Sequence, residues 1–224
     1  MTLARRAVAE FVATAFLLAI VVGSGIMGER LAGGNDAIAL LANSIATGCG
    51  LVVLITTFGP VSGAHMNPLV TLALAGTGRH AWSDVPFYVL AQCAGAIAGV
   101  WIAHAMFALP IVELSSKARA GSAQMFAESV ATFGLLTVIF GGLRHRAKSI
   151  PVSVGCYIAA AYWFTASTSF ANPAVTLARS LTDSFSGIRF ADVGGFIVAQ
   201  FAGATVAIAA DALFFRVSAP VKPR

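Results

Sequence analysis

The sequence predicts an all-α membrane protein, with six transmembrane helices and two re-entrant half-helices in an inverted repeat of three plus three spans. Composition is the first reason. Of the 224 residues, 58% are hydrophobic and only 10% are charged, whereas an ordinary soluble domain carries about 25% charged residues. The mean hydropathy of +0.86 agrees with this class. The other two reasons are a series of long apolar runs and a pair of Asn-Pro motifs in corresponding places.

Six apolar runs are candidates for membrane spans, because a bilayer core requires roughly 20 residues of helix. All but the fifth, which is short, come near that length. The runs cover Val8 to Met27, Ile38 to Phe58, Val85 to Leu109, Gln124 to Leu143, Val152 to Ser167 and Val193 to Phe215. One shorter apolar segment follows the second run and another follows the fifth.

Each of these shorter segments begins with Asn followed by Pro. Asn is a favoured helix N-cap, and Pro suits the first helical position. We therefore expect half-helices to begin at Asn67-Pro68-Leu69 and at Asn172-Pro173-Ala174. Each apolar stretch lasts about ten residues and rises about 15 Å, which is half of a bilayer core. Non-helical backbone at that depth must be buried or line a watery cavity, so each segment is expected to dip into the membrane and turn.

The two halves of the chain repeat one another. Three landmarks recur in the same order, with Glu10 recurring as Glu128, Asn67 as Asn172, and Gln92 as Gln200. We expect one transmembrane domain over residues 1–224, built from repeats of approximately 1–117 and 118–224. Each half holds three spans, an odd number, so the repeat is inverted. The half-helices then enter from opposite faces, and their N-termini meet near the midplane.

The basic residues predict the orientation. With both termini on one side, nine of the 14 basic residues lie there, which predicts cytoplasmic termini and an inner (plasma) membrane location. The nine are Arg5, Arg6, Arg79, Arg144, Arg146, Lys148, Arg216, Lys222 and Arg224. Nucleic-acid binding is not indicated, because no basic patch with interleaved aromatic residues accompanies the net charge of +5. The three cysteines lie inside apolar runs and predict neither a disulfide framework nor a zinc site.

Two facing helix N-termini repel cations, because each carries about half a positive charge. We expect Asn67 and Asn172 to cap their own helices and to leave their amide donors facing the lumen. Such donors would bind the oxygen of a passing neutral solute. The alternative is that the two segments are kinked helices packed within protein.

The paired Asn-Pro motifs, the leader from Ser62 to Pro68, the glutamates Glu10 and Glu128 and the inverted layout together resemble the aquaporin and aquaglyceroporin (major intrinsic protein) family. The resemblance covers essentially the full chain. It implies a passive channel for small uncharged solutes and a homotetramer with one pore per subunit. The chain departs from the family pattern at Leu69, where the family usually has Ala, and at Val175, where it usually has Arg.

The resemblance also implies a narrow filter made by four positions at fixed distances from the two motifs. In this chain they are Thr47, Ala160, Ser169 and Val175. None of the four is aromatic or charged, so we expect a wide and weakly polar filter. The expected solutes are glycerol, urea, undissociated metalloid acids such as arsenous acid, and water. The Val175 substitution is similar to that of bacterial channels associated with arsenic resistance.

Three ionisable residues have two interpretations each. Arg179 lies one helical turn beyond Val175 and could lean over the pore mouth, or it could pair with Asp183 on a solvated helix end. Glu10 and Glu128 lie within apolar runs, where they could relay protons. Their equivalence in the repeat favours a structural role, and the resemblance implies that they hold the backbone of the two dipping loops.

Three further residues are candidates for the channel wall. His65 is expected to brace its loop and line the inner mouth rather than bind metal, because no second His or Cys lies at ligand spacing. Leu51 and Cys156 lie a helical turn from the expected filter positions. Cys156 could admit block by mercurials or could be a buried, inert thiol.

No motif indicates an enzyme, a nucleotide site, a cofactor or a bound metal. Two function classes remain. The first is a passive channel whose partners are small neutral solutes, water and the lipid bilayer. The second is an ion-coupled secondary transporter, which can also use inverted repeats and broken helices at the midplane.

Overall fold

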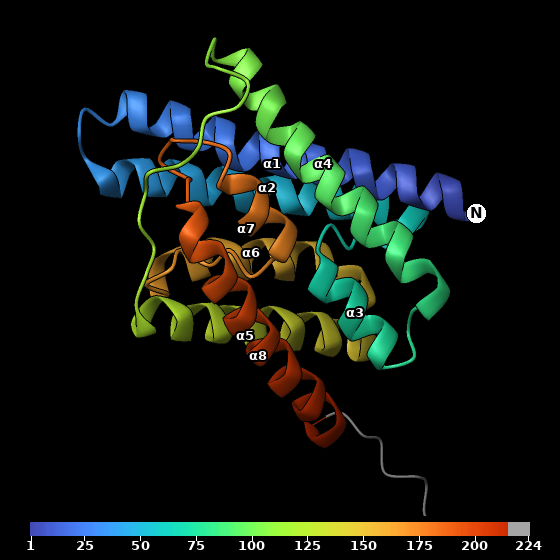
Figure 1. The fold of residues 1–224 in the computed structure, drawn as a ribbon. Coiled ribbons are helices and arrows are strands. Elements are labelled where there is room, and N and C mark those ends of the chain that lie inside the picture. Colours follow the sequence, from blue (N-terminus) through green and yellow to red (C-terminus); the bar gives the residue numbers. More distant parts are fainter. Residues whose placement is uncertain (215–224) are drawn as a thin grey trace, which may run out of the picture.

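The computed structural model describes residues 1–214, and over this range the chain folds into helices joined by loops, without strands (Figure 1). The main helices are α1 (Leu3–Leu31), α2 (Asp36–Ser62), α3 (Pro68–Gly76), α4 (Val85–Met106), α5 (Ser122–His145), α6 (Ile150–Phe164), α7 (Pro173–Arg179) and α8 (Phe190–Phe214). Two single-turn 3₁₀ segments, Trp82–Asp84 and Ala147–Ser149, precede α4 and α6. The expected class of six long helices with two half-helices is confirmed.

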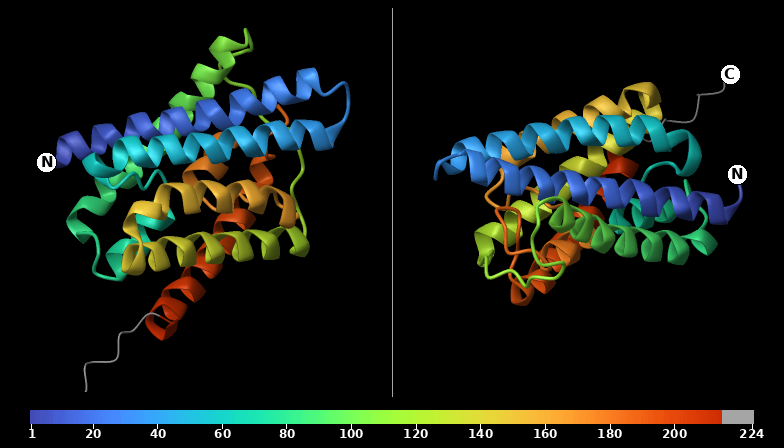
Figure 2. Two further views of the ribbon diagram at one scale, coloured as in Figure 1. Left: turned by 180° about the vertical axis from the view of Figure 1, so that it is seen from behind. Right: turned by 90° about the horizontal axis from the view of Figure 1, so that it is seen from above.

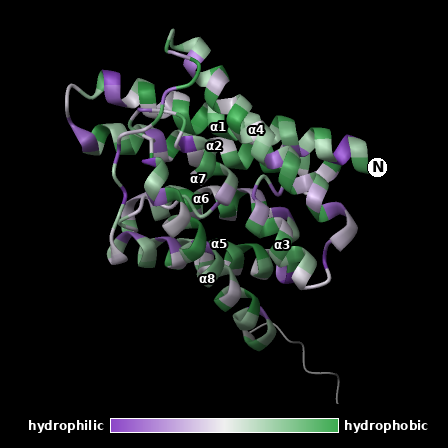
Figure 3. Ribbon diagram, in the orientation of Figure 1, coloured by the Kyte–Doolittle hydropathy of each residue, from purple (hydrophilic) through white to green (hydrophobic). Residues whose placement is uncertain are grey.

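Five helices of the described part are long and apolar enough to cross a membrane, namely α1, α2, α4 (counted with the turn before it), α5 and α8. The remaining long helix, α6, has 15 residues, as the short fifth run predicted. Arg216, Lys222 and Arg224, and Phe215 at the end of the sixth predicted span, lie outside the described residues. Figure 3 shows hydrophobic residues along most of the long helices and hydrophilic ones mainly in the connections.

The two halves use equivalent helix contacts. α1 packs against α2 and α4, and α5 packs against α6 and α8, while α2 and α6 join the halves (Figure 2). A side chain at Gly95 or Gly99 would collide with the α1 backbone at Phe11 and Ala15, and one at Gly203 would collide with the α5 backbone at Ser129. Small residues therefore permit the close helix crossings in both halves, as transmembrane helices often require.

Contacts at the two ends of the helices define the directions of α3 and α7. Arg79, just beyond α3, pairs with Asp211 near the end of α8 at 3.1 Å, which places it at the end of the molecule that holds the N-terminus and the end of α8. We call this the termini end. Ser180, just beyond α7, accepts a backbone hydrogen bond of 3.0 Å from Ser115 in the connection between α4 and α5. This connection lies at the opposite end, which we call the far end. The half-helices therefore run to opposite ends of the molecule.

Candidate functional site

The two half-helices begin at the same place, in the middle of the molecule. Asn67 caps α3, with its Oδ1 accepting from the backbone N of Leu69 at 2.9 Å. Asn172 caps α7 in the same way through the backbone N of Ala174, at 3.0 Å. Pro68 and Pro173 stand at the first helical position of each helix. The helix starts are therefore where the sequence predicts them, and α3 has nine residues and α7 seven.

The two asparagines also join the loops to each other, which the sequence did not predict. The Nδ2 of Asn67 donates to the carbonyl of Ala171 at 2.7 Å, and the Nδ2 of Asn172 donates to the carbonyl of Met66 at 2.7 Å. Each amide has two hydrogens, so one is committed to the facing loop and one is left for the cavity. The expectation that both donors face the lumen is thus corrected, because the facing carbonyl is close enough to accept one of them.

Both loops enter their half-helices through left-handed backbone at equivalent positions. Ala64 and Met66 have φ values of 49° and 48°, and Ser169 and Ala171 have 50° and 48°. Residues with a Cβ rarely adopt this conformation, and they persist there only when the surroundings hold them. The two loops must therefore be strongly braced.

The bracing comes from Glu10 and Glu128, both fully buried. Glu10 accepts from the backbone N of His65 at 2.9 Å and of Met66 at 2.7 Å. Glu128 accepts from the backbone N of Phe170 at 2.8 Å and of Ala171 at 2.9 Å. A buried carboxylate that accepts several hydrogen bonds recovers much of the solvation it has lost.

A glutamine and a threonine complete each bracing cluster. Gln92 donates to Glu10 at 2.8 Å and to the Thr71 hydroxyl at 3.0 Å. In the second half, Gln200 donates to Glu128 at 2.6 Å and to the Thr176 hydroxyl at 2.8 Å. Neither glutamate is among the residues that line the cavity. The geometry therefore fits the loop-holding interpretation of the two glutamates rather than the proton relay.

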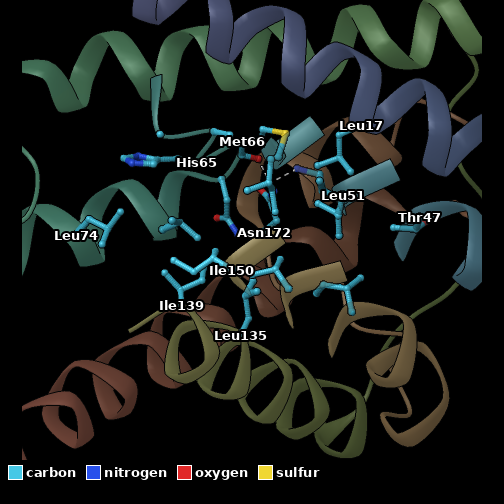
Figure 4. Close-up of a pocket in the computed structure, with 18 of the residues that line it drawn as sticks. Leu17, Thr47, Leu51, His65, Met66, Leu74, Leu135, Ile139, Ile150 and Asn172 are labelled. Atoms are coloured by element: carbon cyan, nitrogen blue, oxygen red, sulfur yellow. Dashed lines mark hydrogen bonds between the residues drawn. The ribbon is translucent and has the colours of Figure 1, made fainter. Parts of the chain in front are cut away.

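One cavity of about 510 Å³ passes the two asparagines. Figure 4 shows Thr47 toward one side of the view, His65 and Leu74 toward the other, and Asn172 between them. The far-end lining includes Thr47, Tyr162, Ser169, Val175 and Arg179, and the termini-end lining includes His65, Arg79, His80, Leu143 and Ile150. Leu51, expected in the wall, also lines the cavity. The lining thus includes residues from both ends of the molecule.

Two of the predicted wall and filter residues are misplaced. Ala160 and Cys156 are exposed on the outer surface of the chain and are not part of the cavity lining. Val154, Ile158 and Tyr162 line it instead. Successive residues of a helix turn by about 100°, so positions two residues away lie about 200° around α6. The predicted positions were counted from Asn172 in the pattern of relatives, and here that count selects the wrong face of α6.

Tyr162 brings an aromatic ring to the far end of the cavity, where the sequence predicted none. It is 3% exposed, and its hydroxyl lies 3.3 Å from Oγ1 of Thr47. Thr47, Ser169 and Val175 are all buried residues of the lining. The far end of the cavity therefore joins α2, α6, α7 and the second loop.

Arg179 lies in the cavity lining at the far end and is only 1% exposed. Its guanidinium carbon lies 3.4 Å from the centre of the Phe170 ring. Its expected partner on a solvated helix end, Asp183, instead accepts from the backbone N and hydroxyl of Ser116 at 2.9 and 3.0 Å. The pairing of Arg179 with Asp183 is therefore wrong, because Arg179 turns inward.

A second buried arginine at the far end, Arg119, was missed. It comes from the connection between α4 and α5, and its Nε donates to the carbonyl of Gly187 at 2.8 Å. Burial lowers the pKa of Arg119 to about 10. Its guanidinium carbon lies 5.0 Å from the centre of the Phe170 ring. No sequence pattern marks such a contact, because loop residues carry no helical period that would give their direction.

The termini end carries a different set of charges. Arg79 and Arg144 both bind the buried carboxylate of Asp211, at 3.1 and 2.9 Å. His65 and His80 pack their rings at a centroid distance of 5.0 Å, and Nδ1 of His65 lies 3.0 Å from the Thr71 hydroxyl. Burial lowers the pKa of His80. His65 thus both lines the cavity and holds its own loop.

Within residues 1–214, no group of three or more His, Cys, Asp and Glu side chains could hold a metal ion. The buried carboxylates hold backbone amides, and the polar side chains of the lining stand on otherwise apolar walls. Such a lining suits the passage of small polar molecules.

A membrane fold of six long helices, with two half-helices meeting beside one cavity, defines a channel-type protein rather than an enzyme. Comparison with known families agrees, because the family model described as "Major intrinsic protein" matches residues 1–169. The chain belongs to the major intrinsic protein family.

Two sequence relatives and one solved structure support this assignment. The chain is 56% identical over 207 residues to aquaglyceroporin AqpS of Rhizobium meliloti (strain 1021), which covers 92% of this chain and 88% of the relative. It is 32% identical to aquaporin NIP1-4 of Oryza sativa subsp. japonica, over 88% and 71% of the two chains. The aquaglyceroporin from Plasmodium falciparum has the same fold, with a TM-score of 0.72 at 20% identity, over 96% and 97% of the two chains.

Proposed function

We propose that the protein is a passive channel that conducts small uncharged solutes, together with water, past its two half-helices. The observation that carries this proposal is the cavity of about 510 Å³, which passes both asparagines and has lining residues from both ends of the molecule. An alternating-access transporter opens its site to one face at a time. A cavity lined from both ends in one conformation therefore favours a channel over the ion-coupled alternative.

The proposed filter consists of Thr47, Tyr162, Ser169 and Val175 at the far end. Tyr162 replaces Ala160 of the sequence-based filter, because Ala160 is exposed. Val175 is short and apolar, so its own side chain narrows the passage less than an arginine at that position would. We infer that the filter admits glycerol, urea and undissociated metalloid acids such as arsenous acid, as well as water.

The proposed midplane consists of Asn67 and Asn172. One hydrogen of each amide is bound by the facing loop, which fixes the direction of the other. Two oriented donors beside apolar walls suit a neutral solute that carries an oxygen acceptor. A cation in the same place would lose its hydration without gaining acceptors, which costs several kcal/mol.

We further propose that the termini end faces the cytoplasm of the inner (plasma) membrane. Six of the 11 described Lys and Arg residues belong to this end, namely Arg5, Arg6, Arg79, Arg144, Arg146 and Lys148. With Arg216, Lys222 and Arg224, the sequence assigns nine of 14 to it, the direction that the positive-inside rule associates with the cytoplasm. The proposed assembly is a homotetramer with one cavity in each subunit, as in the family that the chain resembles. Chemical crosslinking in membranes would test the tetramer. Recovery of the protein only as uncrosslinked monomers would contradict it.

Stopped-flow measurements on reconstituted vesicles test the proposed function. We expect non-saturating flux of glycerol, urea and arsenous acid, with weak temperature dependence and no response to a proton gradient. Val175→Arg should reduce the flux of the larger solutes more than that of water, because the longer side chain fills the filter. Uptake driven by a proton gradient would instead establish the transporter, and unchanged fluxes in Val175→Arg would contradict the proposed filter.

A further inference from the structure

Two buried polar atoms at the far end of the cavity have no hydrogen-bond partner in the described structure. They are Nη1 of Arg179 and Oγ of Ser169. The residues are 1% and 3% exposed, and both line the cavity. A buried charged donor without a partner is costly. Such a donor at the wall of an open cavity is best explained by a partner that passes through the cavity.

The guanidinium of Arg179 is held from the side that faces the protein. Its Nε donates to the carbonyl of Ser186, and its guanidinium carbon lies over the ring of Phe170. The guanidinium of Arg119 shares this ring and donates from Nη1 to the carbonyl of Ser167 at 3.2 Å. These contacts orient Arg179 without neutralising it, since within residues 1–214 its partners are a carbonyl and an aromatic ring rather than a carboxylate.

Helix geometry explains how Arg179 reaches the cavity. Arg179 is the last residue of α7 and stands four residues beyond Val175, one turn along the same face. Side chains of a helix lean toward its N-terminus, so the long Arg179 side chain leans back over the position of Val175. The small apolar side chain at Val175 leaves room for it.

We propose that Arg179 is the selectivity-determining donor of this channel and that it forms, with Ser169, a subsite for small neutral polyols. This inference rests on the proposed function and deepens it. The free edge of the guanidinium donates to one hydroxyl oxygen of the solute, and the Ser169 hydroxyl accepts from, or donates to, the neighbouring hydroxyl. The same uncompensated charge repels cations that approach the filter. Thr47 and Tyr162 supply the opposite wall.

The test compares glycerol permeability, water permeability and potassium conductance of reconstituted vesicles. For Arg179→Ala we expect the glycerol-to-water permeability ratio to fall roughly tenfold, the effect of losing one hydrogen bond to a charged group, and potassium conductance to rise. Arg179→Lys should keep potassium excluded but should recover the glycerol ratio only in part, because an ammonium lacks the planar fork of donors.

Arg30 provides the matched control. It lies at the same end of the molecule, donates to the carbonyl of Phe107 at 3.3 Å and has its guanidinium carbon 5.2 Å from the Phe107 ring centre. It is not part of the cavity lining. Arg30→Ala removes an arginine that lies against a phenylalanine but does not change the cavity lining. We therefore expect the glycerol-to-water permeability ratio and the potassium conductance of this variant to match those of the unmodified protein.

A thiol variant separates the charge from the fold. Arg179→Cys should lose potassium exclusion. Attachment of a positively charged aminoethyl group to the new thiol, through a methanethiosulfonate reagent, should restore it. The unmodified protein is treated in parallel, to correct for reaction at Cys49, Cys93 and Cys156. If no Arg179 variant folds, Ser169→Ala decides, because it should lower the glycerol-to-water ratio several-fold by removing one hydrogen bond.

The outcomes distinguish the two proposals. An unmodified protein without solute flux would overturn the proposed function itself. Normal flux with the same glycerol ratio and potassium conductance in Arg179→Ala would overturn the role of Arg179 alone. An unchanged ratio in Ser169→Ala would overturn the polyol subsite.

Discussion

The middle of the molecule and its two mouths follow different rules. In the middle, each loop is held by a buried glutamate at the equivalent position of its half, and each asparagine donates to the facing loop at the same distance of 2.7 Å. At the mouths the equivalence is lost. The repeat is therefore kept where backbone must be held at membrane depth, and it is broken where solutes enter and leave.

The two mouths differ in how their arginines are compensated. At the termini end, Arg79 and Arg144 share the carboxylate of Asp211, so two positive charges meet one negative charge. At the far end, carbonyl groups and the Phe170 ring hold Arg119 and Arg179. The far mouth therefore has the larger uncompensated positive charge close to the cavity, which makes it the better place to select against cations.

Removing a bracing carboxylate should have the largest effect. Glu128→Ala leaves the backbone amides of Phe170 and Ala171 without their acceptor, and Glu10→Ala does the same to His65 and Met66. Breaking a buried charged network typically costs about 3–5 kcal/mol, so both variants should lower the thermal unfolding temperature in detergent and abolish solute flux.

Glu113→Ala is the control for these two variants, because Glu113 lies in the connection between α4 and α5 and its backbone N donates to the carbonyl of Leu181, beyond α7, rather than to either loop. We expect it to unfold at nearly the same temperature as the unmodified protein. Solute flux retained in Glu10→Ala but lost in Glu128→Ala would show that the two clusters are not equivalent, and it would end the comparison of the halves.

The two midplane asparagines should respond alike to the same substitution. Asn67→Asp or Asn172→Asp keeps an oxygen that can cap the half-helix but removes the donor to the facing carbonyl and adds a negative charge. Each should lower stability by about 1–3 kcal/mol, the cost of an unsatisfied buried acceptor, and should increase potassium conductance. Electrical recording from planar bilayers would measure the second effect, and a large difference between the two variants would argue against a symmetric midplane.

The termini mouth should tolerate loss of its shared carboxylate better than the midplane tolerates a charge. Asp211→Asn keeps the side-chain shape but weakens both ion pairs, so we expect a stability loss of about 1–2 kcal/mol. The glycerol-to-water ratio should change by less than about twofold, which corresponds to about 0.4 kcal/mol, because Asp211 is not among the residues that line the cavity. A larger change in the vesicle assay would place selectivity at this mouth and weaken the assignment to Arg179.

The sequence predicted what local chemistry and repetition determine. The half-helix starts follow from the capping preference of Asn67 and Asn172 and the fixed φ of the following prolines. The paired roles of Glu10 and Glu128 follow from their equivalence in the repeat, together with the family resemblance. None of these inferences required knowing how a helix is rotated about its axis.

The rotation of α6 is what the sequence could not give. This helix is apolar on every side, so no polar stripe marks the face that lines the cavity. Its rotation is instead set by a close crossing at which Gly155 meets the backbone of Gly48 on α2. Arg119 was missed for a related reason, since only the tertiary fold brings its loop against Phe170.

The smallest effect is expected from the residues that the sequence misplaced, and this makes them a sharp test of the α6 orientation. Ala160→Leu adds bulk to an exposed position, so water and glycerol permeabilities should stay unchanged, whereas Tyr162→Ala on the opposite face should alter both.

Mercurial modification of Cys156 should likewise leave flux unchanged, because the thiol is exposed on the outer surface and is not part of the lining. Cys156→Ser distinguishes this site from Cys49 and Cys93. If a mercurial blocks solute flux in the unmodified protein but not in Cys156→Ser, then α6 turns its other face to the cavity.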